Sequence, residues 1–200
     1  MLCCGVEPFR PVRAPSDAPG AAAAMTDLPT AHVPVLLEEV LALLAPRPSG
    51  VFVDGTVGGG GHARVLADRV GPGGRIIGLD RDPAAIDRAA ARLEGTPTTL
   101  VHADFAHLPE VLARLGLDRV DGVLLDLGLS SDQLDDPGRG FSFSSDGPLD
   151  LRFDPGEGEP ARRLINRLDE RRLADLIYRY GEERFSRRIA RAIVRRRREG

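Results

Sequence analysis

The sequence predicts an α/β fold built on a parallel, doubly wound sheet. Short apolar runs alternate with segments of helical spacing between residues 51 and 126, and this alternation is typical of right-handed βαβ units. The first apolar run ends in an aspartate and leads into the turn Gly55-Thr56-Val57-Gly58-Gly59-Gly60-Gly61. With 200 residues, 42% of them hydrophobic, the chain is long enough for one such core and a smaller appendage.

The elements nearest the N-terminus are a helix, a strand and a second helix. Apolar residues recur at helical spacing over residues 34–44 and stop before Pro46, so a helix is expected there. The apolar residues 51–53 close on Asp54 and predict the first strand. A helix over residues 62–70 follows the glycine turn.

The same unit then repeats. Residues 75–80 predict a strand and residues 83–93 a helix, with Asp82 as its N-cap and Pro83 in its first turn. The repetition places the strand ends at Asp54 and Asp80 on one edge of a parallel sheet.

A third strand and helix and a fourth strand complete the alternating region. Residues 98–102 and 108–115 predict the third strand and helix, and the apolar residues 120–126 a strand buried on both faces. An open sheet of this class usually has more than four strands. We therefore expect the sheet to be incomplete in this chain.

A helical module is expected after the sheet. Residues 130–160 are polar and rich in Gly and Pro, and predict a long functional loop. Helices are expected over 161–168, over 171–180 with Gly181 as C-cap, and over 184–198. Three apolar residues share one face of the last helix: Phe185, Ile189 and Ile193.

These patterns divide the chain into three parts. Residues 1–24 are rich in Pro and Ala, lack the features of a secretory signal, and are expected to be a disordered extension, with Met25 as an alternative start. Residues 25–129 form the cofactor-binding core, and 130–200 the loop and helical module. Both cysteines, Cys3 and Cys4, lie in the extension, so we expect no disulfide framework and a reducing cytoplasm.

Charge is distributed unevenly along the chain. The net charge is −3, but residues 1–151 hold 12 Arg against 21 acids, whereas residues 152–200 hold 15 Arg against 9 acids. A basic segment of this kind either follows the phosphates of a nucleic acid or forms a solvated helix face. No apolar run reaches the roughly 18 residues that cross a bilayer, so no membrane contact is expected.

The glycine turn predicts a nucleotide-containing cofactor. Gly58, Gly60 and Ala63 satisfy the pattern G-x-G-x-x-A, and Asp80 follows Gly58 where a ribose-binding acid is expected. NAD and S-adenosylmethionine both fit this pattern. Asp54 favours S-adenosylmethionine, because a carboxylate there repels a pyrophosphate and attracts ammonium and sulfonium charges. In the alternative interpretation, Asp54 and Asp80 only cap turns.

Two further residues near the expected site have ordinary structural explanations. Phe105 follows the third strand and either stacks on an adenine or packs in the core. His62 opens a helix, where packing explains it equally well. With four scattered histidines, no metal site is expected.

Seven motifs between residues 32 and 198 are diagnostic: HVPVLL (32–37), DGTVGGGGH (54–62), DLGLSSDQLD (126–135), RGFSF (139–143), DGPLDLR (146–152), YGEERF (180–185) and RIARAI (188–193). Together they resemble one family, the ribosomal RNA small subunit methyltransferases H, also called MraW. Leu151 and Phe153 depart from the methionines common in the family, and both are volume-tolerant apolar changes.

The resemblance implies a class I methyltransferase, a Rossmann-like fold interrupted by a helical module. It implies cytoplasmic N4-methylation of a cytidine in 16S small-subunit ribosomal RNA, naked or within the assembling 30S subunit. It also implies cofactor contacts by seven residues: Gly60, Gly61, His62, Asp80, Phe105, Asp126 and Gln133. Asp126, which ends the fourth strand, is the candidate catalytic residue, because its carboxylate or the following carbonyls can accept the protons of the cytosine amine.

The long loop and the arginine-rich helices are the expected contacts with RNA. Arg139, Phe141, Phe143 and Arg152 are placed to surround an extruded base, although both phenylalanines have an alternative as packed loop residues. Three other functions remain open: a methyltransferase with another substrate, a non-catalytic RNA-binding fragment, and an NAD-dependent oxidoreductase.

Overall fold

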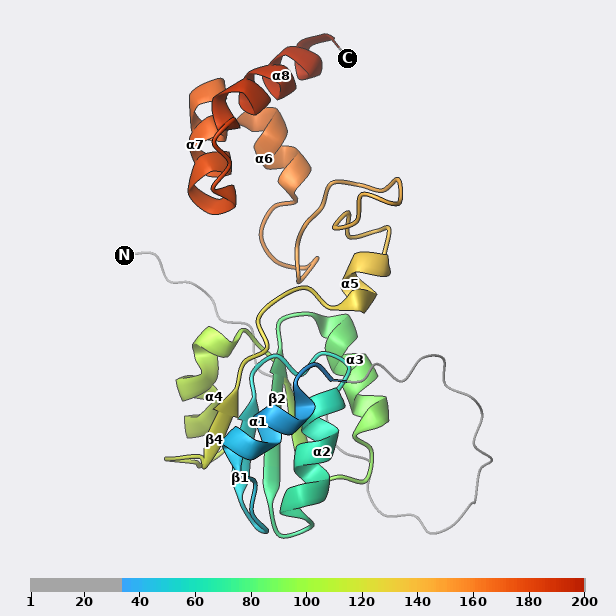
Figure 1. The fold of residues 1–200 in the computed structure, drawn as a ribbon, viewed down its shortest axis with the longest axis vertical. Coiled ribbons are helices and arrows are strands. Elements are labelled where there is room, and N and C mark those ends of the chain that lie inside the picture. Colours follow the sequence, from blue (N-terminus) through green and yellow to red (C-terminus); the bar gives the residue numbers. More distant parts are fainter. Residues whose placement is uncertain (1–33, 200) are drawn as a thin grey trace. The chain divides into compact units, whose positions relative to one another are not determined.

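The computed structural model describes residues 34–199, and these residues form two compact units, the first ending at Gly128 and the second beginning at Leu129 (Figure 1). The expected disordered extension over residues 1–24, the alternative start at Met25 and the two cysteines lie outside the described residues.

The first unit contains a sheet of four parallel strands in the order β3-β2-β1-β4. The strands are β1 (Val51–Asp54), β2 (Arg75–Asp80), β3 (Thr98–His102) and β4 (Gly122–Leu124). The chain runs outward from β1 to β3 and then crosses back to β4. The strand order therefore reverses between β1 and β4, and open α/β sheets bind ligands outside the carboxyl ends of the strands at such a reversal.

Helices cover both faces of this sheet (Figure 1). The helices α1 (Leu37–Leu44), α2 (Gly61–Val70) and α3 (Pro83–Arg92) pack with Phe52 and Ile76. The helix α4 (Leu108–Arg114) packs with Val53 and Ile77 on the opposite face. Neighbouring residues of one strand point to opposite faces, which explains why Phe52 and Val53 belong to different core clusters. The doubly wound α/β fold is thus confirmed.

Short-range signals fix the helix starts in this unit. The Asp82 side chain accepts a hydrogen bond from the Ala84 amide at 3.0 Å, with Pro83 following as the first helical residue. The predicted N-cap of α3 is therefore confirmed. Asp104 caps the short 3₁₀-helix η1 (Phe105–His107) in the same way, through the Ala106 amide at 2.8 Å.

The fourth strand differs from its prediction. It was expected over residues 120–126 and buried on both faces, but β4 spans three residues and the side chain of Val123 is 41% exposed. Leu125, just beyond the strand, is exposed as well. The reason is the position of the strand. Among the described residues β4 lies at one edge of the sheet and pairs only with β1, so the apolar composition of residues 120–126 did not ensure that their side chains are buried.

The second unit consists of a short helix, a loop and three longer helices. Its helices are α5 (Ser131–Asp135), α6 (Ala161–Arg167), α7 (Glu170–Gly181) and α8 (Ser186–Glu199). The helices α7 and α8 pack around four buried residues, Leu173, Ala174, Ala190 and Val194. Arg197 of α8 donates hydrogen bonds to the Ile165 and Leu168 carbonyls, so its guanidinium satisfies backbone groups at the end of α6.

Two expectations for this unit were wrong. The loop prediction for 130–160 missed α5, which has a capping box between Ser130 and Gln133. The left-handed residue that ends α7 is Glu182, with φ 51°, whereas the expected C-cap Gly181 is still helical. In α8 the buried face contains Ala190 and Val194. The larger side chains of Phe185 and Ile189 are exposed instead.

The loop between α5 and α6 folds closely on itself. Gly140 has φ 71°, and a Cβ there would lie 2.2 Å from the Pro148 carbonyl oxygen. A Cβ on Gly147 would lie 2.0 Å from the Pro137 carbonyl oxygen. Both contacts leave room only for glycine, so these two residues let distant parts of the loop touch.

Candidate cofactor-binding site

The glycine turn lies at the carboxyl end of β1, where the strand order reverses. Gly58 and Gly60 have φ 52° and 80°, values that favour glycine. The Val57 amide donates to the Leu79 carbonyl at 2.8 Å and the Gly55 amide to the Leu124 carbonyl at 2.9 Å. The turn is therefore attached to β2 on one side and to β4 on the other. A Cβ on Gly59 would meet nothing within 4 Å, so the turn's outer side is open.

Asp54 lies beneath this turn. Its side chain is 1% exposed, and its Oδ1 accepts a hydrogen bond from the Thr56 amide at 3.2 Å. Burial raises the pKa of Asp54 from 3.8 to about 7; the Thr56 hydrogen bond opposes this rise, and the charges of Asp80 and Asp126 add to it. Because Asp54 is covered, it acts on a ligand through its electrostatic potential.

Asp80 connects the glycine turn to the start of α3. Its Oδ2 accepts from the Gly58 amide and its Oδ1 from the Asp82 amide, both at 2.8 Å. Burial raises the pKa of Asp80, while these two hydrogen bonds lower it in part. An ionised carboxylate has about four acceptor sites, so capacity remains for ribose hydroxyls. The turn-capping contacts expected in the alternative interpretation are thus present, but they occupy only part of the hydrogen-bond acceptor capacity of the Asp80 carboxylate.

Asp126 lies two residues beyond β4 and is joined to the glycine turn by Thr56. The Asp126 amide donates to the Thr56 hydroxyl oxygen at 2.7 Å, and the Asp126 side chain is exposed. The same threonine donates its amide to Asp54. Sequence reasoning did not single out Thr56, because its contact joins residues 70 positions apart. The structure therefore gathers Asp54, Asp80 and Asp126 around one turn.

Phe105 lies beside the carboxylates at the carboxyl end of β3. It opens η1 and is 40% exposed, so its ring is not a core residue. A Cβ on Gly55 would lie 3.2 Å from the Phe105 Cβ, which places the aromatic residue next to the turn. An exposed ring in this position offers an apolar surface to a planar base.

Gly61 and His62 face the segment before α1. The His62 side chain is buried, and its Nε2 lies 3.0 Å from the Val35 carbonyl oxygen. A Cβ on Gly61 would lie 2.8 Å from the Pro34 Cγ. Both residues thus pack the start of α2 against residues 34–35. This contact is the packing role that the sequence offered as the alternative for His62.

Gln133 belongs to the second unit. Its side-chain oxygen accepts a hydrogen bond from the Ser130 backbone amide at 3.1 Å, and its backbone amide donates to the Ser130 hydroxyl oxygen at 3.2 Å. The side chain is buried in this capping box. Of the seven expected cofactor contacts, six therefore lie in the first unit, and Gln133 is held in α5.

The loop residues expected to surround a base divide into structural and exposed ones. Arg139 is buried and donates to the Phe153 carbonyl at 2.6 Å, while Arg152 binds both carboxylate oxygens of Asp150 at 2.7 and 2.8 Å. Phe141 packs against Phe153 with ring centroids 5.7 Å apart. Both arginines and Phe141 therefore hold the loop together, whereas Phe143 is fully exposed.

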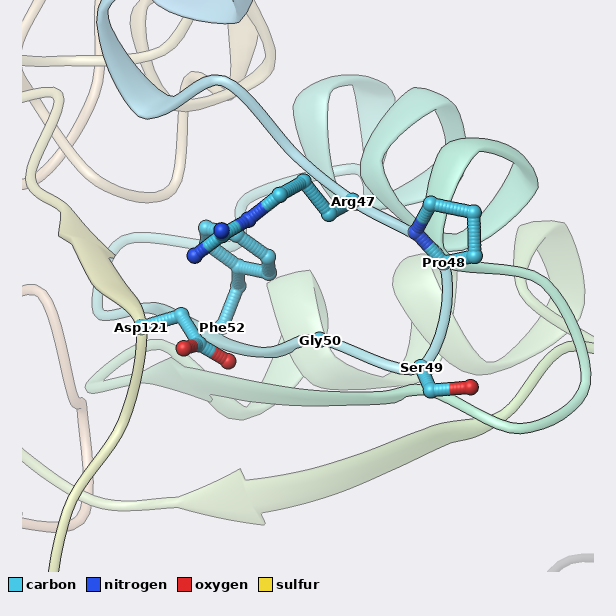
Figure 2. A pocket seen from close by; sticks show the side chains of 6 residues that line it. All are labelled: Arg47, Pro48, Ser49, Gly50, Phe52 and Asp121. Carbon is cyan, nitrogen blue, oxygen red and sulfur yellow. The ribbon is translucent and has the colours of Figure 1, made fainter.

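A separate cavity of about 280 Å³ lies in the first unit at the opposite end of the sheet (Figure 2). It is lined by Arg47, Pro48, Ser49, Gly50, Phe52 and Asp121. Asp121 there accepts from the Val51 amide at 2.7 Å, which ties the starts of β1 and β4 together. The cavity is remote from the carboxyl ends of the strands and is not part of the carboxylate site.

Residues 34–199 contain neither a cluster of metal ligands nor a membrane-spanning helix. No group of three or more His, Cys, Asp or Glu side chains among them is arranged to hold a metal ion. None of their helices is long and apolar enough to cross a membrane.

The parallel sheet, the glycine turn at the strand reversal and the acids ending β1 and β2 define a Rossmann-like nucleotide-binding α/β domain. The particular family follows from sequence comparison. The sequence profile of the MraW methylase family matches residues 29–200, and the chain belongs to this family. Its α/β fold is accordingly that of a class I methyltransferase.

Curated relatives carry the description "Ribosomal RNA small subunit methyltransferase H". The protein of Syntrophobacter fumaroxidans is 56% identical over 84% of this chain and 53% of its own length. That of Sorangium cellulosum is 55% identical over 81% and 51%. A solved structure described as a putative rRNA-methylase from Clostridium thermocellum is 25% identical, with a TM-score of 0.43 over 48% of this chain and 53% of that one. The chain spans about half the length of the curated relatives it matches.

Proposed function

We propose that this chain binds S-adenosylmethionine and is part of an enzyme that methylates the N4 amine of a cytidine in 16S small-subunit ribosomal RNA. The observation that carries the proposal is the gathering of Asp54, Asp80 and Asp126 around the glycine turn. A negative site of this kind favours a cationic cofactor over a pyrophosphate-bearing one. Membership of the MraW methylase family supports the same cofactor.

Each part of the cofactor has a candidate partner in the first unit. The exposed ring of Phe105 offers a stacking surface for the adenine. Asp80 accepts hydrogen bonds from the ribose hydroxyls with the acceptor sites that its two amide contacts leave. Asp54 and Asp126 attract the ammonium and sulfonium charges. Gly60, with φ 80°, and Gly61, which has no room for a side chain beside Pro34, let the turn take the path that brings its backbone toward the cofactor.

The cofactor, once bound, supplies an electrophilic methyl group, and the protein has to align the acceptor and receive a proton. The lone pair of the cytosine amine is delocalised into the ring, so the amine is a poor nucleophile. The exposed Asp126 carboxylate, or the carbonyls of Leu127 and Gly128, accept hydrogen bonds from the amine and localise its lone pair. The Asp126 carboxylate would take up the amine proton that is released when the methyl group passes from the sulfur to N4, whereas the backbone carbonyls would only orient the amine.

Small-subunit ribosomal RNA, or the assembling 30S subunit in the cytoplasm, is the proposed partner. The names of the curated relatives support this substrate. The second unit supports it physically, because α8 alone contains seven arginines and one glutamate. Arginine-rich helices of this kind neutralise RNA phosphates, and such binding weakens steeply with added salt.

Two measurements on this chain test the proposal. Calorimetric titration with S-adenosylmethionine and with NAD should give binding of the first and none of the second; the reverse result would exclude a methyltransferase. Transfer of a labelled methyl group is then assayed on 30S particles and naked 16S RNA that lack the modification, with DNA, protein and small molecules as competing acceptors. Cofactor binding without transfer to any acceptor would support the non-catalytic alternative instead.

A further inference from the structure

A cluster of exposed aromatic side chains and arginines lies where α7 passes into α8. The Phe185 side chain is 49% exposed, and the guanidinium carbons of Arg184 and Arg188 lie 4.6 and 5.8 Å from its ring centroid. Tyr180 is 77% exposed, with the guanidinium carbon of Arg179 at 5.6 Å from its ring. These five residues are called the α7–α8 cluster.

The backbone of the α7–α8 cluster is fixed. The Phe185 amide donates to the Glu183 carboxylate at 2.7 Å, and its carbonyl accepts from the amides of Arg188 and Ile189 at 2.9 and 3.0 Å. Phe185 therefore opens α8 in a defined position. The amide of Glu182 closes α7 through the Tyr178 carbonyl at 2.9 Å. An aromatic ring held this way is presented without a large ordering cost on binding.

Folding of the second unit does not explain the exposed rings. Its core is built from Leu173, Ala174, Ala190 and Val194. Phe141, in contrast, packs against Phe153 inside the loop. An aromatic ring half in solvent, next to two guanidinium groups, is more typical of a binding surface than of a core.

Resting on the proposed function, we propose that the α7–α8 cluster is a stacking platform for an unpaired base of the RNA substrate, additional to the base that is methylated. Proteins bind single-stranded RNA by stacking bases on aromatic rings while cationic side chains hold the phosphates. Phe185 and Tyr180 supply the rings. Arg179, Arg184 and Arg188 supply the positive charge, and α8 extends it with further arginines.

The charges near the cluster favour nucleic acid over an acidic protein partner. Glu182 and Glu183 are the nearest acids in the sequence, and Glu183 accepts the Phe185 amide. Of the seven arginines of α8, Arg191 pairs with Glu170 and Arg197 donates to carbonyls of α6, while the other five are exposed; Glu199 is the one acid of the helix. The regularly spaced phosphates of a single-stranded RNA can pair with the exposed arginines along α8, while one base stacks on Phe185 at the start of this helix.

Substitution of Phe185 tests the platform. The full chain is titrated with a fluorescent, unstructured RNA of roughly 12 nucleotides, a length that one such site covers. Phe185→Ala should weaken binding by roughly 5- to 150-fold, the range for loss of one stacked base. Phe185→Trp should retain binding. The matched control is Tyr178→Ala, which removes an exposed ring of α7 outside the cluster and should leave affinity unchanged.

Salt dependence separates stacking from charge. The slope of affinity against salt should stay the same in Phe185→Ala and become shallower in Arg184→Gln, because only the second change removes a phosphate contact. Circular dichroism of each variant establishes that α7 and α8 are folded, and an unchanged affinity for S-adenosylmethionine establishes that the first unit is intact.

Five outcomes of these titrations decide whether the platform exists. Wild-type affinity in folded Phe185→Ala, or equal losses in Phe185→Ala and Tyr178→Ala, would overturn the platform, as would a failure of the wild type to bind RNA. Tight binding of an acidic protein in place of RNA would also overturn it. RNA binding that depends on Phe185 without any methyl transfer would support the platform while counting against the proposed enzyme.

Discussion

Replacing Asp54 by asparagine removes the buried charge beneath the glycine turn. In the folded protein the pKa of Asp54 is about 7, against 3.8 for the free side chain. The folded state therefore retains a proton that the unfolded state loses, so stability falls as pH rises from 3.8 to 7 and stays low above. At 1.36 kcal/mol per pKa unit, the ionised carboxylate costs about 4 kcal/mol at pH 8. Asp54→Asn should recover a large part of this at pH 8 and little at pH 4, as measured by urea unfolding.

The same substitution should impair cofactor binding. A cationic ligand favours ionised Asp54 and lowers its pKa, so binding near pH 6 releases a proton. The affinity of the wild type for S-adenosylmethionine should therefore fall as pH drops below 7. In Asp54→Asn the affinity should be lower at pH 8 and should lose the part of this pH dependence that Asp54 causes. Calorimetry in two buffers of different ionisation enthalpy measures the protons released.

The control is Asp68→Asn, because Asp68 lies on α2, is exposed and pairs with Arg64 away from the turn. This variant should match the wild type in both stability and affinity. The reasoning would be refuted if Asp54→Asn bound the cofactor as tightly as the wild type at pH 8. It would equally be refuted if Asp54→Asn lowered stability at pH 8.

Four other substitutions have defined outcomes. Phe105→Ala should weaken S-adenosylmethionine binding by about 3- to 10-fold through loss of a stacking surface, measured by titration at pH 8; an unchanged affinity would remove Phe105 from the site. Gly140→Ala should lower the free energy of unfolding by about 3 kcal/mol, because Gly140 has a left-handed φ and the new Cβ would collide with the Pro148 carbonyl. Its control is Gly181→Ala, which lies within α7 with free space around it and should be neutral or stabilising by up to about 1 kcal/mol. Leu173→Ala should lower the free energy of unfolding by about 2–5 kcal/mol, because it leaves a cavity in the core of the second unit, and the helical circular dichroism signal should fall.

Much of the first unit could be predicted from its sequence. The strands β2 and β3 match their predicted residues throughout, because each is an apolar run bounded by turn residues. The strand β4 was predicted too long and too buried, since an apolar run does not reveal whether its strand lies at an edge. The helix α5 was missed although Ser130 and Gln133 form the S-x-x-Q signature of a capping box.

The candidate site was predictable where it depends on strand ends. Asp54, Asp80 and Asp126 lie together because parallel strands bring their carboxyl ends to one edge. The bridge from Thr56 to Asp126 was not predictable, because it joins separate strands through a single hydroxyl group. The exposure of Phe185 was not predictable either: helical periodicity gave a face, but the smaller Ala190 and Val194 occupy the core.

The two amide contacts of Asp80 have a consequence for ligand exchange. This carboxylate fastens Gly58 and Asp82 through hydrogen bonds within the chain, so the turn acquires its shape when the chain folds. The conformational entropy of the glycines is therefore lost during folding and not on binding, so ordering of the turn does not weaken the affinity for the cofactor. Preorganisation of this kind predicts that Asp80→Ala loosens the turn as well as the ribose contact, a double loss from one side chain.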